Sequence, residues 1–509
     1  MADTNQAQLS YVEETTFGTT PASALTNLRI TGESFGHNID NIVTAEIRAD
    51  RQVTDLIQAD AEASGSYDFE LSFGSPPDDF LEGVLFTSWG AAISGGTPVD
   101  YTAAGDGISF AATDNSINDA ANGFVTAGIR AGQWLRVSGC ATSANNTLHK
   151  VLTVTAAKIV CSRDTVVSVD DGIGDTVRLV GGVNINTALL SAGNADGVYT
   201  FSTGNPTIEG IRVGQWLEIR GFTTAANNGY KRVSAVDTTT FTTEQTTATE
   251  AEGDEILIQG LMIRNDDKLH SYTIQRELTD IIQFFRFGGQ VPGTLNLTVS
   301  AGAIITGSID FLGGTIASTD IAQASYGTGS NTAAPTNDIV TAITNVAQIM
   351  EGSTLADIAS DLYIQEISFS VVNNLRGRKA IGSFGNVGIG IGKFDCTGSI
   401  NVLFNDETMY EKFLAATETG LSFKIEDTDG NAYIITFPRV KFETDDGGKA
   451  TGQDADIVEN MGFRALRDPT TNCTIQIDKF PATMTVSSSS SSSQSSSSSS
   501  ESSSSSSSA

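Results

Sequence analysis

Apolar and polar residues alternate along many short stretches of this chain, the pattern of strands with one buried face. The clearest stretch runs from Gly65 to Phe73, where aromatic and aliphatic residues alternate with Asp68, Glu70 and Ser72. We expect a strand there, with the apolar side chains on one face and the two acids on the other.

A helix is predicted directly after this strand. The segment S75-P-P-D-D-F-L-E-G-V-L-F begins with prolines and acids, which are favoured in the first turn of a helix. The strand has a counterpart late in the chain, since G65-S-Y-D-F-E-L matches G398-S-I-N-V-L-F. Phe80-Leu81 and Phe413-Leu414 share the same offset, and we call this correspondence the long repeat. One β fold with a flanking helix is therefore expected to occur twice.

A second correspondence, the short repeat, links I129-R-A-G-Q-W-L-R-V-S-G with I211-R-V-G-Q-W-L-E-I-R-G. Each copy continues through an Asn-Asn turn into Val- and Thr-rich strands. The turn spacing predicts two small β-barrels or sandwiches of roughly 70–80 residues. Both would be inserted into the first copy of the larger fold.

The expected fold class is therefore mainly β: two tandem β-sandwich or barrel folds, A and B, each with a flanking helix, plus two small inserted β modules. The predicted division is 1–90 for the first part of fold A, 91–181 for module 1, 182–260 for module 2, 261–314 for the second part of fold A, 315–360 for a linker with a helix around 339–350, 361–486 for fold B, and 487–509 for a disordered serine-rich tail.

The net charge of −31 argues against a protein that binds nucleic acid tightly, because phosphate binding needs clustered Lys and Arg. It is compatible with DNA passing nearby, since a like-charged wall repels DNA and keeps it from sticking. The segment from Met1 to Thr20 lacks the pattern of a signal peptide, and the longest apolar cluster, I281-I-Q-F-F-R-F, is too short to span a bilayer. We therefore expect a soluble protein made in the cytoplasm, with no membrane partner.

No motif predicts catalysis, a cofactor or a metal ion. The three histidines stand at unrelated places in the repeats. G385-N-V-G-I-G-I-G lacks the lysine and the helix that follow a phosphate loop, and a hairpin is favoured. D427-T-D-G-N lacks the later ligands of a calcium loop and is interpreted as a hairpin turn. An enzyme is not expected.

Cysteines and tryptophans leave one question open. Cys140, Cys161, Cys396 and Cys473 are expected to be reduced and partly buried thiols. Trp134 and Trp216 occupy the same repeat position. An exposed tryptophan would suit a sugar-binding face, whereas a strand tryptophan in a small barrel more often belongs to its core, which is the interpretation we favour.

The chain resembles phage tail tube proteins of long-tailed, non-contractile phages. The resemblance covers the two larger folds and leaves out the insert and the tail. It rests on S271-Y-T-I-Q-R-E, F284-F-R-F-G-G, A303-I-I-T-G-S-I-D-F-L-G-G, V372-N-N-L-R-G, F394-D-C-T-G-S-I, D429-G-N-A-Y-I-I-T-F-P-R-V-K-F and F463-R-A-L-R-D-P.

This resemblance implies stacked rings whose inner β-barrel surrounds a channel for genomic DNA. Because the fold occurs twice, we expect three chains to supply six tube folds in each ring, with strand edges pairing between subunits. The expected partners are copies of the chain, other phage tail proteins at the tube ends, and DNA that passes without specific binding. The expected location is the tail of the virion.

Asp68 and Glu70, with Asn401 as the counterpart of Asp68 in fold B, are the candidate lumen-facing residues. In the alternative interpretation, the two acids face solvent or pair with Arg48 or Arg51. The main alternative function is an acidic β-rich surface or receptor-binding adhesin with two carbohydrate-binding modules at 91–260.

Overall fold

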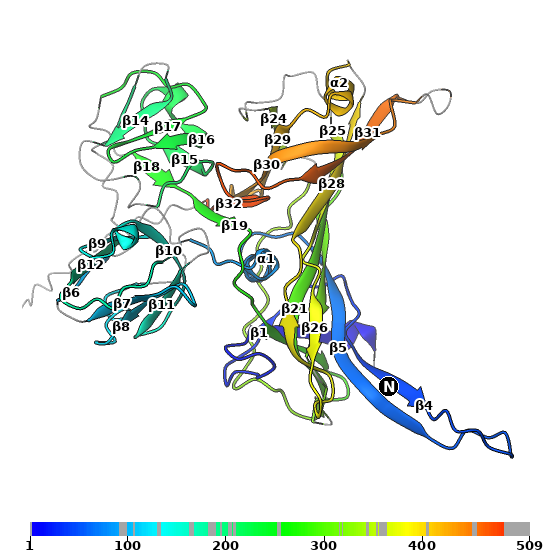
Figure 1. Ribbon diagram of the computed structural model, residues 1–509. Helices are drawn as coiled ribbons and strands as arrows, with labels where there is room; N and C mark the ends of the chain where they lie inside the picture. Colours follow the sequence, from blue (N-terminus) through cyan, green and yellow to red (C-terminus); the bar gives the residue numbers. More distant parts are fainter. Residues whose placement is uncertain are drawn as a thin grey trace, which may run out of the picture.

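The computed structural model describes most of the chain. The described residues are 3–90, 99–104, 107–129, 134–161, 167–181, 190–193, 196–201, 206, 210–251, 256–314, 316–317, 319–342, 346–352, 355, 364–403, 407–449, 453 and 456–482. The protein is mainly β, as the alternating pattern predicts. Among these residues, seventeen strands form one connected sheet system, and two smaller sheets lie in the inserted segment (Figure 1).

Fold A is built from strands on both sides of the insert. Its elements are β1 (Ala7–Glu13), β3 (Gly32–Glu33), β4 (Gly36–Val43), β5 (Leu56–Glu70), α1 (Pro77–Leu85), β20 (Tyr272–Leu278), β21 (Gln283–Ser300), β22 (Thr306–Leu312) and β23 (Ile321–Ala322). Strand β5 pairs with β4 on one side and β22 on the other, and β21 pairs with β20, β22 and β23. Strand β1 completes the order by pairing with β20.

Fold B repeats this order of pairings. Its elements are β24 (Val346–Gly352), β25 (Ile364–Val372), β28 (Asp395–Leu403), α2 (Thr408–Leu414), β29 (Thr419–Glu426), β30 (Ala432–Asp445), β31 (Val458–Ala465) and β32 (Gln476–Phe480). Strand β28 pairs with β25 and β31, and β30 pairs with β29, β31 and β32. Strand β24 pairs with β29, as β1 pairs with β20. The duplication predicted from the long repeat is therefore a duplication of topology.

Two structural details show which residues of fold A correspond to which residues of fold B. The hydroxyl oxygens of Ser34, which directly follows β3, and Ser66 of β5 lie 2.8 Å apart, and those of Ser368 of β25 and Ser399 of β28 lie 2.9 Å apart. The register of β21 against β22 shifts directly after Pro292, and the register of β30 against β31 shifts directly after Phe442. Pro292 of β21 therefore corresponds to Phe442 of β30, and the other positions of the two strands correspond in step with this pair.

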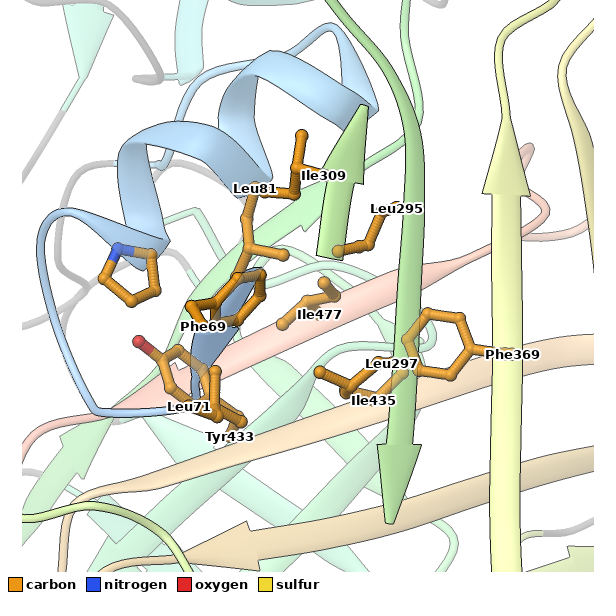
Figure 2. Close-up of a pocket in the computed structure, with 11 residues that line it drawn as sticks. Phe69, Leu71, Leu81, Leu295, Leu297, Ile309, Phe369, Tyr433, Ile435 and Ile477 are labelled. Atoms are coloured by element: carbon orange, nitrogen blue, oxygen red, sulfur yellow. The ribbon is translucent and has the colours of Figure 1, made fainter. Parts of the chain in front are cut away.

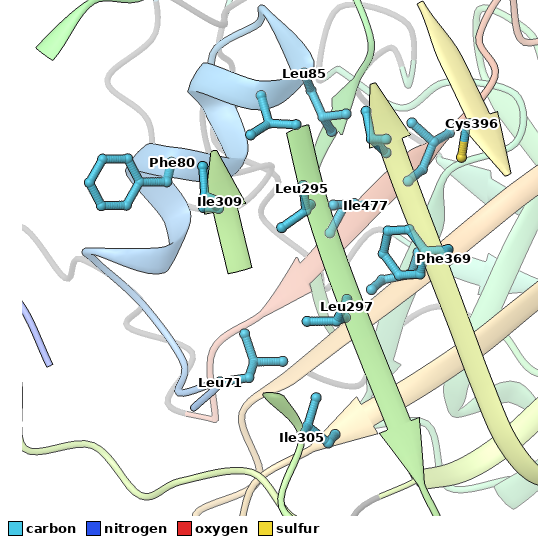
Figure 3. Close-up of a cluster of buried hydrophobic side chains, with 14 of the residues drawn as sticks. Leu71, Phe80, Leu85, Leu295, Leu297, Ile305, Ile309, Phe369, Cys396 and Ile477 are labelled. Carbon is cyan, nitrogen blue, oxygen red and sulfur yellow. The ribbon is translucent and has the colours of Figure 1, made fainter. Parts of the chain in front are cut away.

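The two folds are joined through one ladder and one core. Strand β21 of fold A pairs with β25 of fold B, with Asn296 opposite Ser370 and Leu297 opposite Phe369. Buried side chains of both folds belong to a single hydrophobic cluster, in which Phe369 approaches Leu295 and Leu297 (Figure 3). Fold A and fold B therefore stabilise each other by burying a common apolar surface.

The flanking helices follow from the sequence as predicted, but they differ in burial. Helix α1 has Pro76 at its N-cap and Asp78 and Asp79 in its first turn, where acidic groups interact favourably with the helix dipole. Phe80 and Leu85 of this helix are fully buried. In α2, Leu414 is 66% exposed, so this helix has an apolar side chain facing solvent in the single chain.

The insert contains two separate sheets. The seven-stranded sheet of module 1 comprises β6 (Val99–Ala104), β7 (Ile108–Ala111), β8 (Ser116–Asp119), β9 (Trp134–Ser138), β10 (Leu148–Val154), β11 (Lys158–Cys161) and β12 (Thr176–Gly181). The six-stranded sheet of module 2 comprises β13 (Leu190–Ala192), β14 (Val198–Phe201), β15 (Trp216–Arg220), β16 (Gly229–Val236), β17 (Thr240–Thr243) and β18 (Leu257–Gln259). Each module has its own hydrophobic core.

The remaining short elements are the 3-10 helices at Thr4–Gln6, Ser143–Asn145 and Ala225–Asn227, with strands β2 (Thr26–Asn27), β19 (Leu261–Arg264), β26 (Arg376–Lys379) and β27 (Asn386–Gly390). Strands β26 and β27 form the hairpin predicted at the glycine-rich segment. The turn from Asp427 to Asn431 joins β29 to β30, as predicted, and the Asp427 carboxylate accepts a 2.8 Å hydrogen bond from the Asn431 amide.

The helix predicted around residues 339–350 is wrong. Residues 346–350 lie in β24, which pairs with β29 over Val346–Gly352, and Ile339 forms a bridge with Ser72. This part of the segment predicted as a linker therefore completes the sheet of fold B. Pairing with a strand that is distant in the sequence outweighed the helix-like local spacing of apolar residues. The predicted serine-rich tail, 487–509, lies outside the described residues.

Candidate functional site

A polar face crosses the sheet from fold A to fold B without interruption. It begins at β5 and continues over β22, β21, β25, β28 and β31, because side chains on one face of each strand are opposite those on the next. One row of opposed positions comprises Asp68, Ser308, Asn296, Ser370, Thr397 and Arg464. A second row comprises Glu70, Thr306, Thr298, Ser368, Ser399 and Gly462. We call this surface the polar sheet face.

The three candidate residues from the sequence lie on the polar sheet face. Asp68 is exposed and Glu70 is half-buried on β5, while the neighbouring Tyr67 and Phe69 are buried, as the alternation predicts. Asn401 is half-buried on β28, opposite Glu366 and Asn460. The structure thus brings Asp68 and Asn401 to one surface, with three strands between β5 and β28, and does not place them in contact.

The charge of the polar sheet face is predominantly negative. Asp310 on β22 stands opposite Ser66 and close to Asp68, and burial together with the negative charge of Asp68 raises the pKa of its carboxyl. Arg464 contributes a positive charge, but it pairs with Asp395 and, at 2.6 Å, with Glu443. Arg48 forms its ion pair with Asp50 at the tip of the β4–β5 hairpin, away from the two candidate acids.

The apolar side of the sheet holds the junction between the two folds. Leu81 projects from α1 of fold A towards Tyr433, Ile435 and Ile477 of fold B, and these residues line one small apolar cavity (Figure 2). Because its lining is hydrocarbon with a single phenol, this cavity offers no set of polar groups for a ligand. The cavity lies where helix α1 packs against the strands of fold B.

A buried polar cluster fixes the same helix. The Asp78 carboxylate accepts a 2.6 Å hydrogen bond from the Tyr433 hydroxyl and forms an ion pair with Lys479. The Tyr433 hydroxyl in turn accepts a 2.9 Å hydrogen bond from the amide of Gly74. A buried carboxylate is tolerated because both partners satisfy it, and each partner comes from fold B.

Module 2 is also docked on fold B. Trp216 is 1% exposed, and it packs in a cluster with Met350, Leu355, Ala432, Ile434 and Phe480. Its indole nitrogen donates a 3.1 Å hydrogen bond to the hydroxyl of Thr436. The prediction that this tryptophan is buried is confirmed, but it fills the contact between module 2 and fold B instead of the core of the module. The side chain of Trp134 in module 1 lies outside the described residues.

Polar groups surround Trp216 in this contact. Asp478 of β32 is fully buried and accepts a 3.2 Å hydrogen bond from the Trp216 amide and a 2.6 Å bond from Gln476. Burial raises the pKa of the Asp478 carboxyl to about 7. Arg264 donates to the carbonyl oxygens of Val213 in module 2 and Thr471 in fold B, and so links the two.

The described side chains do not form the arrangements typical of metal sites, reactive thiols or membrane spans. Within the described ranges, no group of three or more His, Cys, Asp or Glu side chains is arranged to hold a metal ion. The four cysteines are free and buried, and burial raises the pKa of the Cys161 thiol to about 12. None of the described helices is long and apolar enough to cross a membrane.

Sequence reasoning missed most residues of the polar sheet face and the contacts between the folds. The alternation in L295-N-L-T-V and in I364-Q-E-I-S-F-S-V-V contains the signal for the rest of the polar sheet face, since its polar residues are the ones that continue the rows from Asp68 and Glu70. By contrast, nothing near Asp78 in the sequence identifies Tyr433 and Lys479 as its partners, because they lie in another fold.

The family model for phage tail tube proteins matches residues 4–465 of the chain. A comparison with curated proteins gives no match. The duplicated β folds, the uninterrupted sheet and this match define a structural β protein of a phage tail. The chain belongs to the phage tail tube protein family, and this membership implies a subunit of a virion tail that assembles into a tube.

Proposed function

We propose that three chains close into a ring in which fold A and fold B occupy alternate positions, and that rings stack into a tube that conducts genomic DNA. The observation that carries this proposal is the β21–β25 ladder, which joins fold A to fold B edge to edge with the polar side chains on one face. A head-to-tail contact of this kind produces a ring when its rotation closes.

In this arrangement the polar sheet face lines the channel. Its hydroxyl, amide and carboxylate groups are compatible with a hydrated surface, and its acids Asp68, Glu70 and Asp310 repel phosphate groups. Because Asn401 stands in fold B where Asp68 stands in fold A, the negative charge alternates around the ring. DNA then passes without a specific site, and the partners at the tube ends are other tail proteins.

The modules lie to one side of the two folds, away from the β4–β5 hairpin (Figure 1). We assign them to the outside of the tube, because Trp216 packs on residues of β30 and β32 and not on the polar sheet face. The boundaries predicted for the domains remain a prediction.

Electron microscopy and mass measurement of the purified protein test the proposal. Rings or tubes with a central channel, and a ring mass of three chains, are expected. Rings of six chains would contradict the use of both folds as ring positions, and monomers at all protein concentrations would contradict the tube function.

A further inference from the structure

We propose that the junction between fold A and fold B is the template of the contact between chains, in which Leu414 of one chain packs on Phe285 and Ile321 of a second copy. This inference rests on the ring assembly proposed above, and it specifies which surfaces meet. It starts from the correspondence of the two folds, because two ring positions with the same fold offer equivalent edges to their neighbours.

The donor side of the contact is helix α2. Leu81 of α1 and Leu414 of α2 occupy equivalent positions in the long repeat. Leu81 is half-buried against Tyr433, Ile435 and Ile477 of the following fold. Leu414 is 66% exposed in the single chain.

The acceptor side is found by the same correspondence. Ile477 of β32 is opposite Ile435 of β30, and Ile321 of β23 is opposite Phe285 of β21. Phe285 and Ile321 therefore stand in fold A where Ile435 and Ile477 stand in fold B. Ile321 is 52% exposed and Phe285 is half-buried, and the nearby Ile282 is 61% exposed. An apolar surface thus remains at the position that Leu81 covers in the next fold.

The open sheet edges also allow fold B of one chain to meet fold A of a second copy. Within the described strands, β4 pairs only with β5, so its second edge is open. Among the pairings of the described residues, the side of β30 that faces β29 is unpaired beyond Val440, where Thr419 is the last partner. The internal ladder places Thr294 opposite Val372. The equivalent positions are Thr444 of one chain and Asn38 of the second copy, and both are exposed.

We therefore assign one partner to both edges, a second copy of this chain. The β30 edge of fold B in one chain pairs with the β4 edge of fold A in the second copy. Open edges of this kind otherwise pair indiscriminately, and closing them in a ring removes that hazard. The exposed apolar residues on α2, β21 and β23 are covered by the same closure.

Cysteine cross-linking tests the register. The double variant Asn38→Cys/Thr444→Cys should form a disulfide between chains on mild oxidation, because directly opposed strand residues bring their Cβ atoms within disulfide range. The matched control Thr294→Cys/Val372→Cys should form its disulfide within one chain. The native thiols are buried and do not compete. Under non-reducing denaturing conditions, the first variant should give bands up to three chains and the control a single chain.

A second variant tests the apolar contact. Leu414→Asp should raise the protein concentration needed for ring formation by about tenfold or more, since it places a charge in a desolvated contact. Ile173→Asp in module 1, where Ile173 is 68% exposed, should leave it unchanged. Circular dichroism and the melting temperature of the unassembled chain should be the same for both variants.

The outcomes separate this contact from the tube function. The contact would be overturned, and the tube function left intact, by one combination of results. In that combination the unmodified chain forms rings, the cysteines at positions 38 and 444 form no cross-link, and the Leu414→Asp variant assembles normally. Absence of rings from the unmodified chain would overturn the tube function itself. Cross-linked species larger than three chains would overturn closure by three chains.

Discussion

Tyr433 donates a hydrogen bond of 2.6 Å to the carboxylate of Asp78, and this contact joins a strand of fold B to the helix of fold A. Asp78→Ala removes the ion-pair partner of Lys479, whose side chain is only 16% exposed, and should lower the free energy of unfolding by about 3–5 kcal/mol. Tyr433→Phe removes one hydrogen bond to a charged acceptor and should cost about 1.5–3 kcal/mol. Urea unfolding of the unassembled chain measures both.

The control for this pair is Glu411→Ala. Glu411 is the counterpart of Asp78 in α2 and is exposed in the single chain, so its removal should change the free energy of unfolding by no more than about 0.5 kcal/mol. Equal small effects of all three variants would show that the buried cluster does not hold the two folds together.

Trp216→Ala should detach module 2 from fold B. The change removes a large buried side chain and its hydrogen bond to Thr436, with an expected cost of about 3–5 kcal/mol to docking. Module 2 has its own core, so we expect it to stay folded and to melt in a separate transition. Trp216→Phe should retain part of the docking. A single unchanged transition for Trp216→Ala would contradict this interpretation.

Asp478 should make stability depend on pH. Its pKa is about 7 in the folded chain because of burial, whereas an unperturbed aspartate has a pKa of about 3.9. The folded state therefore binds the proton more tightly, and the resulting stabilisation is complete below pH of about 4 and is lost as the pH rises to about 7. The positive charges of Arg264 and Arg232 oppose this rise in pKa, while Gln476 and the Trp216 amide donate hydrogen bonds to the carboxylate.

Asp478→Asn carries no proton to lose, so the difference in melting temperature between the unmodified chain and the variant should change between pH 4 and 7 in favour of the variant. Outside this range the difference should be constant. A difference that is constant throughout would show that the pKa of Asp478 is the same in the folded and the unfolded chain.

Module 1 should be removable. Val99 of β6 is opposite Gly181 of β12, so the two ends of the module lie side by side and can be rejoined after deletion of residues 99–181. Tubes should still form, with a smaller outer diameter in electron micrographs. Deletion of module 2 as well uncovers Phe480 and Ile434, and we expect that larger deletion to aggregate. Loss of rings on removal of module 1 alone would place it in the tube wall.

Charge reversal tests the channel. Asp68→Lys/Glu70→Lys should leave ring and tube assembly intact but reduce DNA delivery by phage that carry it, because cationic groups on the wall hold phosphate. The control Asp171→Lys/Asp237→Lys makes the same change in net charge at exposed positions of the two modules. Normal infectivity of the first variant would exclude a luminal position for these acids.

Local patterns predicted the elements that depend on neighbouring residues. The alternation from Gly65 to Phe73 indicated β5 and its two faces, and the prolines and acids after it indicated α1, because each signal acts within a short stretch of chain. The repeat then carried both predictions to β28 and α2. The same signals could not identify β24, whose residues become a strand through pairing with β29.

The contacts between the folds could not be predicted from the sequence, for a different reason. Asp78 resembles any helix-start acid, and Trp216 resembles the core residue of a small barrel. Their roles depend on Tyr433, Lys479 and Thr436, which lie far along the chain and belong to another fold. Composition indicated that acids are abundant, but only the strand registers show which of them share one face.

The ladder between β21 and β25 also changes the thermodynamics of growth. In a ring of three chains, every second junction is closed when the chain folds, and the tethered partner is present at an effective concentration on the order of millimolar. Only the remaining junctions require a collision between molecules and the loss of translational and rotational freedom that accompanies it. A fused pair of folds should therefore nucleate rings at lower protein concentration than two separate copies of the fold, and incomplete rings should be shorter-lived.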